Sequence, residues 1–305
     1  MPEPASPSVA PHPADRVLAG VGLMLTGIFF FALNDAMGKY LVATFSVGQV
    51  LLIRSIAGLA VLTPFIAREG RAAFTAAPRR GIQLLRAVLL TLEVAAFYWA
   101  LTSMPLADVM TFYLAGPIYV TAMSPFLLGE KVGWRRWSAV AAGFIGVMIA
   151  LDPSGQSLSP AALVAIAGSL MFSMSMICTR LVRGTSDIAL ITAQTAAALV
   201  FGAVTSPFVW VAVSWMDGAL LVLLGVVATF AHFCINRALK LAPASVVVPY
   251  QYTTIVWAVL LGYVFFGDVP SWHMVAGAAI IIGAGIYIFF REQVRGRQTA
   301  FADPP

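Results

Sequence analysis

The stretch ALTSMPLADV at residues 100–109 returns, in altered form, as ALKLAPASVV at residues 238–247, at an offset of 138 residues. Each copy places an Ala-Leu pair, three further residues and a proline directly before a long apolar run. Beyond that run the same offset continues to match residues: Gly129-Glu130 with Gly267-Asp268, and Trp134 with Trp272. The chain therefore contains an internal repeat, and this repeat decides how the rest of the sequence is divided.

The beginnings of the two copies match more loosely, but in the same order. At offsets of 140 or 141 residues, the matched pairs are Gly27 with Gly168, Phe31 with Phe172, Lys39 with Arg180, and Arg54 with Gln194. We therefore expect a first repeat at residues 17–151, an external linker at 152–160 and a second repeat at 161–290. The polar segments 1–16 and 291–305 are expected to be cytoplasmic tails. The first tail is expected to be disordered because it is rich in proline and lacks apolar periodicity.

The composition of the chain is that of a protein with many membrane-spanning segments. Its 305 residues are 60% hydrophobic and only 10% charged, and the mean hydropathy is +0.91. Soluble domains carry about a quarter charged residues. The first apolar run is too long for the apolar segment of a cleaved signal peptide, so we expect it to remain as a helix.

Ten apolar runs are long enough, or nearly long enough, to cross a bilayer, which takes about 20 residues. They lie near residues 17–38, 46–67, 81–101, 107–128, 137–151, 161–182, 188–212, 218–239, 244–266 and 272–290. Each repeat holds five of them, and an odd number of spans places the two repeats in opposite orientations. The expected fold is therefore all-α, with ten transmembrane helices in two inverted five-helix repeats. This construction is typical of secondary transporters, which bind substrate near the midplane between the halves. A duplication that serves packing alone is the alternative.

The positions of the basic residues predict the orientation of the chain. If the N-terminus is cytoplasmic, 15 of the 18 Lys and Arg residues fall on the inner side, and only Lys39 lies near the outer face. Such an asymmetry is the usual signature of membrane topology. Both termini are therefore expected in the cytoplasm, and the net charge of +5 does not indicate a nucleic-acid partner.

Several of these features together resemble a known family. The two five-span halves, the repeated AL-x3-P turn and the Gly-acid-x3-Trp loop before AAGFIGVMIAL (141–151) resemble the EamA branch of the drug/metabolite transporter superfamily. The stretches NDAMGKYL (34–41) and LLRAVLL (84–90) resemble its subgroup of bacterial S-adenosylmethionine and riboflavin importers. The resemblance implies a basket in which spans 1, 3, 4, 6, 8 and 9 surround a central cavity, with spans 5 and 10 at one side. It also implies ATP-independent passage of a small organic metabolite through a bacterial inner membrane.

Two charged residues lie deep within the predicted spans. Arg54 is eight residues into the second span, ~12 Å deep at the rise of a helix, where it would contact an anionic group of a substrate or hold a structural ion pair. Glu93 is too deep in the third span to reach the surface, so it is a candidate proton carrier or partner for a cationic substrate. The alternative is an ion pair between these two residues. Arg86 and Phe97 share the helix face of Glu93, and Arg86 is near enough to the cytoplasmic end to extend its charge to the surface.

The equivalent spans of the second repeat also carry polar residues. Gln194 corresponds to Arg54 by the repeat, and His232 and Asn236 form part of a polar stripe on the eighth span. His232 can titrate near neutral pH, and a buried structural histidine is the alternative. All three are candidate substrate-binding residues.

Aromatic residues beside prolines mark the fourth and ninth spans. Tyr113, Tyr250 and Gln251 could bind a flat heterocycle by stacking and by hydrogen bonds at its edge. For Tyr250 the alternative is a place in the aromatic belt at the membrane interface.

The first span ends with three polar residues. Asp35 and Lys39 are four residues apart, a spacing that allows an ion pair within one helix, and we expect this pair to form an outer gate. Asn34 continues the face of Gly20 and Gly27 at seven-residue spacing and is expected to point inward, toward the substrate.

Other classes of function find less support. The sequence shows no HExxH, GxSxG or paired-aspartate motif of a membrane enzyme, and the isolated cysteines Cys178 and Cys234 have no metal-ligand spacing around them. We expect no cofactor and no metal. The predicted function is uptake of an aromatic or cationic metabolite by alternating access, by a monomer or homodimer, with a proton as the candidate coupling ion. An exporter of amino acids or other metabolites, a membrane enzyme and a scaffold are the alternatives.

Overall fold

The structure is a computed structural model that describes residues 13–70, 79–129, 132–151, 159–182, 185–242 and 247–302. The side chains at 13–16, 236, 239–240, 248–249 and 291–302 lie outside this description. The side chain of the candidate Asn236, the first tail up to residue 12 and most of the predicted linker therefore fall outside the description.

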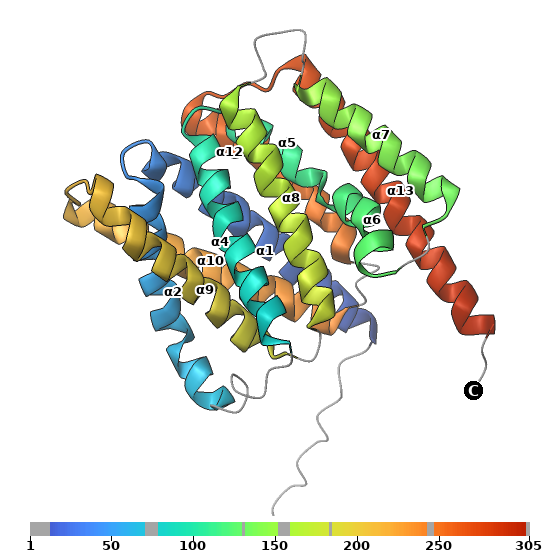
Figure 1. The fold of residues 1–305 in the computed structure, drawn as a ribbon, viewed down its shortest axis with the longest axis horizontal. Coiled ribbons are helices and arrows are strands. Elements are labelled where there is room, and N and C mark those ends of the chain that lie inside the picture. The colour runs from blue at the N-terminus through green and yellow to red at the C-terminus, as the bar shows by residue number, and fades with distance from the viewer. Residues whose placement is uncertain are drawn as a thin grey trace, which may run out of the picture.

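The described part of the chain is a bundle of helices without strands (Figure 1). In order, they are α1 (Pro13–Val42), α2 (Val47–Glu69), α4 (Arg80–Leu101), α5 (Leu106–Leu114), α6 (Gly116–Leu127), α7 (Trp134–Leu151), α8 (Pro160–Leu181), α9 (Asp187–Thr205), η1 (Ser206–Val209), α10 (Trp215–Leu241), η2 (Val248–Thr253), α12 (Thr254–Phe266) and α13 (Trp272–Ala302). Three spans are made of two pieces each: α5 with α6, α9 with η1, and η2 with α12. The predicted ten-helix, all-α fold is confirmed.

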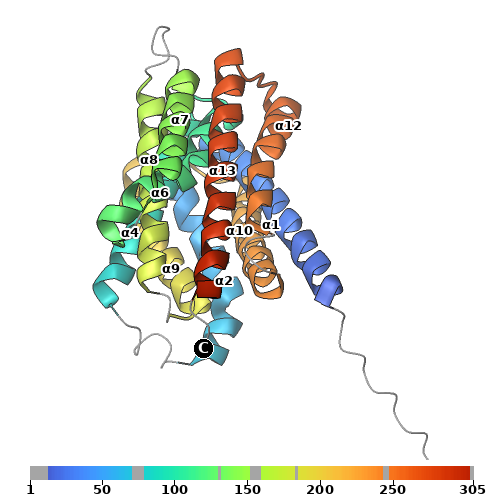
Figure 2. The same ribbon diagram turned by 90° about the vertical axis from the view of Figure 1, so that its right-hand side faces the viewer.

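The apolar lengths agree with ten crossings of a membrane. Eight stretches among the described residues are long and apolar enough to span it, and the piece Tyr250–Phe266 is a shorter apolar helix. The tenth is α7, with 18 residues. The beginning of α1 and the end of α13 lie at the same end of the bundle, as an even number of crossings requires (Figures 1 and 2).

The two ends of the bundle need names. We call the end at which α1 stops and α2 starts the Lys39 end. The opposite end, at which α4 starts and α13 stops, is the Arg86 end.

Equivalent helices of the two repeats begin and end by the same local chemistry. The side chains of Ser46 and Ser186, 140 residues apart, cap α2 and α9. Each accepts a hydrogen bond from the main-chain N–H of the residue three positions later, which is Gln49 or Ala189. A serine at this position satisfies one of the free N–H groups of the first turn. Gly129 and Gly267, 138 residues apart, have φ of 67° and 68°, a left-handed conformation that costs glycine little. The repeat seen in the sequence is thus also a repeat of local geometry.

The fourth span is broken near its middle by Pro117. Proline has no N–H to continue the helical ladder, so α5 ends at Leu114 and α6 begins at Gly116. Ser173 of α8 donates a hydrogen bond of 3.3 Å to the Gly116 carbonyl. The break is therefore stabilised by a neighbouring helix.

The helices pack in pairs that the repeat relates to each other. α1 packs against α10 and α4 against α8, which are equivalent pairs, while α2 packs against α9 and α5 against α12. α7 and α13 lie side by side at one flank of the bundle (Figures 1 and 2). This arrangement is the one that the family resemblance implied for spans 5 and 10.

Replacing Gly277 with Val should destabilise the protein, because this glycine lets α13 contact α7 closely. A Cβ there would lie 2.6 Å from the Ala150 Cβ and 2.6 Å from the Gly146 carbonyl oxygen. Overpacking of this kind costs about 1–3 kcal/mol, which thermal unfolding in detergent would measure. Gly283→Val is the matched control on the same helix, since a Cβ at Gly283 meets no atom within 4 Å. Equal melting temperatures for the two variants would contradict the prediction.

Candidate functional site

A cluster of polar side chains lies at the middle of the bundle, where three helices of the first repeat meet. It consists of Asp35 on α1, Arg54 on α2, and Glu93 and Tyr98 on α4. Tyr113, near the end of α5, lies beside Glu93. We call these five residues the central cluster. A charged side chain at such depth is costly unless it faces protein or water, so their arrangement calls for a physical reason.

Arg54 is held by an aromatic and an amide side chain. Its Nη1 donates a hydrogen bond of 2.5 Å to the Tyr98 hydroxyl, and its guanidinium lies 5.4 Å from the centre of the Tyr98 ring. The Tyr98 hydroxyl donates in turn to Asn34 Oδ1 at 3.5 Å, and Asn34 Nδ2 donates to the Leu224 carbonyl at 2.8 Å. Asn34 thus points inward, as expected, and links α1 to α10.

The two carboxylates of the central cluster lie close to Arg54 without a direct ion pair. Asp35 and Glu93 interact electrostatically with Arg54, and Glu93 also with Asp35. Within the described ranges, neither carboxylate has a basic nitrogen within 4.0 Å. Glu93 is 8% exposed. The direct Arg54–Glu93 ion pair that the sequence left open is therefore not formed in this arrangement.

Aromatic rings line the side of the cluster next to Glu93. The Phe97 and Tyr113 rings meet edge to face at 5.2 Å, and Phe172 of α8 lies 6.3 Å from Tyr113. The Tyr113 hydroxyl donates a hydrogen bond of 3.2 Å to the main-chain carbonyl of Glu93. Phe97 shares the helix face of Glu93, and Tyr113, predicted only as a residue of the fourth span, also lies beside Glu93.

A cavity of about 50 Å³ lies beside Arg54. It is lined by residues of α2, α4, α9 and α10, among them Arg54, Thr91, Gln194, Thr195, Thr229 and His232. This volume has room for a few water molecules, so a metabolite can enter only if helices move. The resemblance implied a cavity surrounded by spans 1, 3, 4, 6, 8 and 9, whereas spans 2, 3, 7 and 8 line this one.

Gln194 and His232, two candidate substrate-binding residues of the second repeat, both line this cavity. The Nδ1 atom of His232 lies 2.8 Å from the Ala228 carbonyl, and its ring meets Phe31 edge to face at 4.7 Å. Gly225, also in the lining, lets α10 approach α2, because a Cβ there would lie 3.0 Å from the Ala57 Cβ.

Two candidates of the ninth span lie apart from the central cluster. The Gln251 side chain is exposed, and Tyr250 packs on a separate hydrophobic cluster that includes Met24 and Ile28. The 3-10 turn η2 carries both residues, and a sequence pattern does not reveal how such a turn directs its side chains. Neither residue has a described contact with Arg54 or Glu93.

Arg86 joins the two repeats near the Arg86 end. Its Nε donates to Thr179 Oγ1 at 2.7 Å and its Nη1 to the Leu190 carbonyl at 3.3 Å. The first partner is on α8 and the second on α9. Arg86 therefore ties α4 to the second repeat instead of only extending its charge to the surface.

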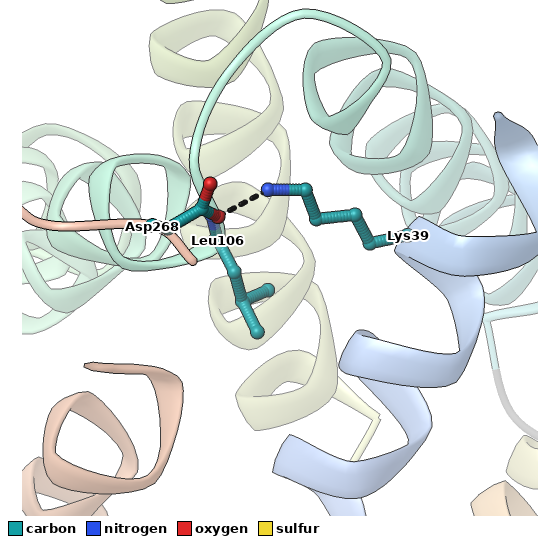
Figure 3. A network of polar contacts seen from close by, with 3 residues as sticks. All are labelled: Lys39, Leu106 and Asp268. Atoms are coloured by element: carbon teal, nitrogen blue, oxygen red, sulfur yellow. Dashed lines mark hydrogen bonds and ion pairs between the residues drawn. The ribbon is translucent and has the colours of Figure 1, made fainter. Parts of the chain in front are cut away.

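At the Lys39 end, the prediction of an ion pair between Asp35 and Lys39 is wrong. Lys39 Nζ pairs instead with Asp268, which lies beyond the end of α12 (Figure 3). Asp268 reaches this position because Gly267 ends α12 in the left-handed conformation. Asp35 is one turn deeper on α1 and lies near Arg54. A partner 229 residues away thus replaces the one four residues away.

The Lys39–Asp268 pair gathers three elements at one point. Asp268 Oδ2 also accepts a hydrogen bond of 3.4 Å from the Leu106 main-chain N–H at the start of α5 (Figure 3). Lys39 Nζ lies 4.6 Å from the centre of the Phe266 ring. The Lys39 and Asp268 side chains are only 13% and 18% exposed. The pair is therefore mostly shielded from solvent and connects α1 of the first repeat with α12 of the second.

A second polar link between the repeats lies at the same end. Gln49 Nε2 donates to the Val211 carbonyl at 2.7 Å, and the Val211 N–H donates to Gln49 Oε1 at 3.1 Å. Gln49 is fully buried in α2, and Val211 belongs to the segment before α10.

Several residues of these networks were not predicted as site residues, among them Tyr98, Phe172 and Asp268. Tyr98 follows Phe97 directly but is off the helix face on which Glu93 was noticed. Phe172 and Asp268 entered only as partners in the repeat alignment. That alignment was the signal that could have found Asp268, because it marked an acidic residue after the same glycine in both halves.

Comparison with known proteins gives one family and several relatives. A family model described as the EamA-like transporter family matches the chain twice, at residues 18–151 and 159–291. An S-adenosylmethionine uptake transporter of Rickettsia prowazekii is 28% identical, over 90% of this chain and 94% of that protein. A riboflavin transporter of Rhizobium johnstonii is 30% identical, over 96% of this chain and 98% of that protein.

Two further similarities are more distant. The pseudopaline exporter CntI of Pseudomonas aeruginosa is 24% identical, over 89% of this chain and 96% of that protein. A solved crystal structure with 18% identity aligns with a TM-score of 0.61, over 90% of this chain and 97% of the other. At that identity the likeness concerns the fold alone.

Proposed function

Since this chain belongs to the EamA-like transporter family, we propose that it takes up an aromatic or cationic metabolite across a bacterial inner membrane. Relatives named for uptake of S-adenosylmethionine and for transport of riboflavin support this choice of substrate. The single observation that carries it is the central cluster, with two carboxylates and one guanidinium between helices of an inverted-repeat bundle. The cluster would bind the substrate, and Asn34, Phe97, Gln194 and His232 would contribute from its surroundings.

The mechanism that we propose is alternating access of the central cluster. The concentration of Lys and Arg residues near the Arg86 end supports a cytoplasmic location for that end and for both termini. The Lys39 end would then face outward. The Lys39–Asp268 pair would close the cluster from that side, because it fastens helices of different repeats together. Arg86, bonded to α8 and α9, would fasten α4 at the inner end.

The remaining details of the proposal are inferred from the residues alone. A proton bound at Glu93 or His232 is the candidate coupling ion, and the protein would act without a cofactor, as a monomer or homodimer and not as an enzyme. Export of an amino acid or another metabolite is the second candidate, because one relative is named as an exporter. The direction of transport decides between the two.

Uptake into proteoliposomes without added nucleotide tests the proposal. We expect radiolabelled S-adenosylmethionine or riboflavin to accumulate to a higher level than in liposomes without protein. Liposomes preloaded with the same unlabelled compound should exchange it for labelled compound, as alternating access requires. If neither compound is taken up and neither is exchanged, the proposed function is contradicted. A flat pH profile of uptake would count against proton coupling alone.

A further inference from the structure

We infer that the central cluster is a dipolar binding site that selects a substrate carrying both a cationic centre and an anionic group, with net positive charge. This inference rests on the proposed transport function and narrows its substrate class. It divides the site into an acidic side, beside Asp35 and Glu93, and a basic side, beside Arg54.

The acidic side offers what an organic cation requires. Asp35 and Glu93 interact electrostatically, and neither has an ion-pair partner within 4.0 Å among the described side chains. Removing a carboxylate from water is costly unless a cation and hydrogen bonds compensate it. The Tyr113 and Phe97 rings lie on this side, and aromatic faces also attract cations. A sulfonium or ammonium group would therefore be stabilised by both the charges and the rings.

The basic side offers what an anion requires. Arg54 Nη1 donates one hydrogen bond to the Tyr98 hydroxyl. A guanidinium has five N–H groups, so further N–H groups of Arg54 can donate to a ligand. Arg54 also lines the cavity, together with the amide side chain of Gln194. The hydroxyls of Thr195 and Thr229, which line it too, donate to main-chain carbonyls of their own helices. No acidic residue is found among the described residues that line this cavity. A carboxylate would find donors and a positive charge there.

The balance of formal charges decides between the two substrate types that the relatives suggest. When both carboxylates are ionised, which a bound cation favours, the two carboxylates and one guanidinium carry one negative charge in excess. S-adenosylmethionine carries a sulfonium, an ammonium and a carboxylate, and so one positive charge in excess, beside a flat purine ring. Riboflavin is flat but has no net charge. The site is thus complementary to a compound of the first type.

The test compares two ligands that differ only at the cationic centre. S-adenosylhomocysteine lacks the sulfonium methyl group of S-adenosylmethionine and, with it, the positive charge on sulfur. Binding of each to the purified protein would be measured by isothermal titration calorimetry and by thermal shift. We expect S-adenosylmethionine to bind about tenfold more tightly or better, a ratio typical of one close charge pair.

Variants of the two carboxylates locate the source of this preference. In Asp35→Asn and in Glu93→Gln, the affinity ratio of the two ligands should fall toward one, because S-adenosylmethionine loses more affinity than S-adenosylhomocysteine. Elution of each variant as a single species in size-exclusion chromatography shows that it is folded. Asp217→Asn removes an acidic charge at the exposed start of α10 and should leave the ratio unchanged.

Several outcomes would overturn the inference. They are failure of S-adenosylmethionine to bind, equal affinities of the two ligands for the unmodified protein, tighter binding of riboflavin, and an unchanged ratio in both carboxylate variants. If neither variant folds, the ratio in the unmodified protein decides. Uptake of riboflavin by a protein that binds the two adenosyl ligands equally would refute the inference but not the proposed function. Tighter binding of S-adenosylmethionine without transport of any compound would refute the proposed function but not the inference.

Discussion

Replacing Asp268 with Asn is expected to open the Lys39 end, so that a cysteine placed at Ala36 reacts about tenfold faster with a water-soluble thiol reagent. Ala36 is buried and lies one turn below Lys39 on the same face of α1. The Lys39–Asp268 pair holds α1 against the end of α12. Asn at position 268 can no longer form an ion pair with Lys39. The loss should shift the population toward conformations in which the two repeats separate at this end.

The expected size follows from the burial of the pair. Exposed ion pairs contribute about 0–1 kcal/mol, and breaking a buried one costs about 3–5 kcal/mol. The two side chains are 13% and 18% exposed, which places this pair between the two cases. About 1.4 kcal/mol, a factor of ten, is therefore a moderate expectation.

The labelling experiment uses purified protein in detergent, where both ends are accessible, so the result does not depend on the orientation in the membrane. The two buried cysteines, Cys178 and Cys234, are first replaced with Ala. The reversed pair Lys39→Asp with Asp268→Lys should restore slow labelling, and Asp217→Asn should leave the rate unchanged. If Asp268→Asn labels Ala36→Cys at the original rate, the pair does not close this end.

The architecture could be predicted because it depends on features that repeat along the chain. Apolar runs of spanning length and a match at a constant offset were enough to predict ten helices in two inverted halves, and the family model confirms the resemblance. The serine caps at Ser46 and Ser186 show why equivalent helices start at equivalent residues. The turn η2 broke this regularity, and the two candidates on it, Tyr250 and Gln251, lie apart from the central cluster.

The polar contacts were harder to predict because they depend on helix packing. Arg54 and Glu93 were found from the cost of a charge inside a membrane, which requires no knowledge of neighbours. The partner of Lys39 was mistaken because the rule for residues four apart considers one helix only. Asp268 reaches Lys39 only after α1 and α12 have packed together. Tyr98 was missed for the same reason, since its hydroxyl matters only through Arg54 and Asn34.

Replacing Arg54 with Gln is expected to reduce uptake of the substrate about 100-fold or more. Arg54 is the positive charge with which Asp35 and Glu93 interact, and its loss leaves two carboxylates facing each other in a nonaqueous site. Leaving a buried charge without compensation costs about 3–5 kcal/mol, which corresponds to factors of 100 to several thousand. The Tyr98 hydroxyl would also lose its 2.5 Å hydrogen bond.

The comparison with Arg54→Lys separates the charge of Arg54 from its shape. Lysine restores the positive charge but not the planar fork that lies over the Tyr98 ring, so we expect uptake about tenfold below the unmodified protein. Arg237→Gln, on the exposed surface of α10, is the matched control and should keep normal uptake. Each rate would be divided by the amount of protein that elutes as a single folded species in size-exclusion chromatography. If Arg54→Gln retained uptake within about threefold of Arg237→Gln after that correction, Arg54 would have only a packing role. The central cluster would then lose the residue on which its basic side depends, and the acidic pair alone would have to account for substrate binding.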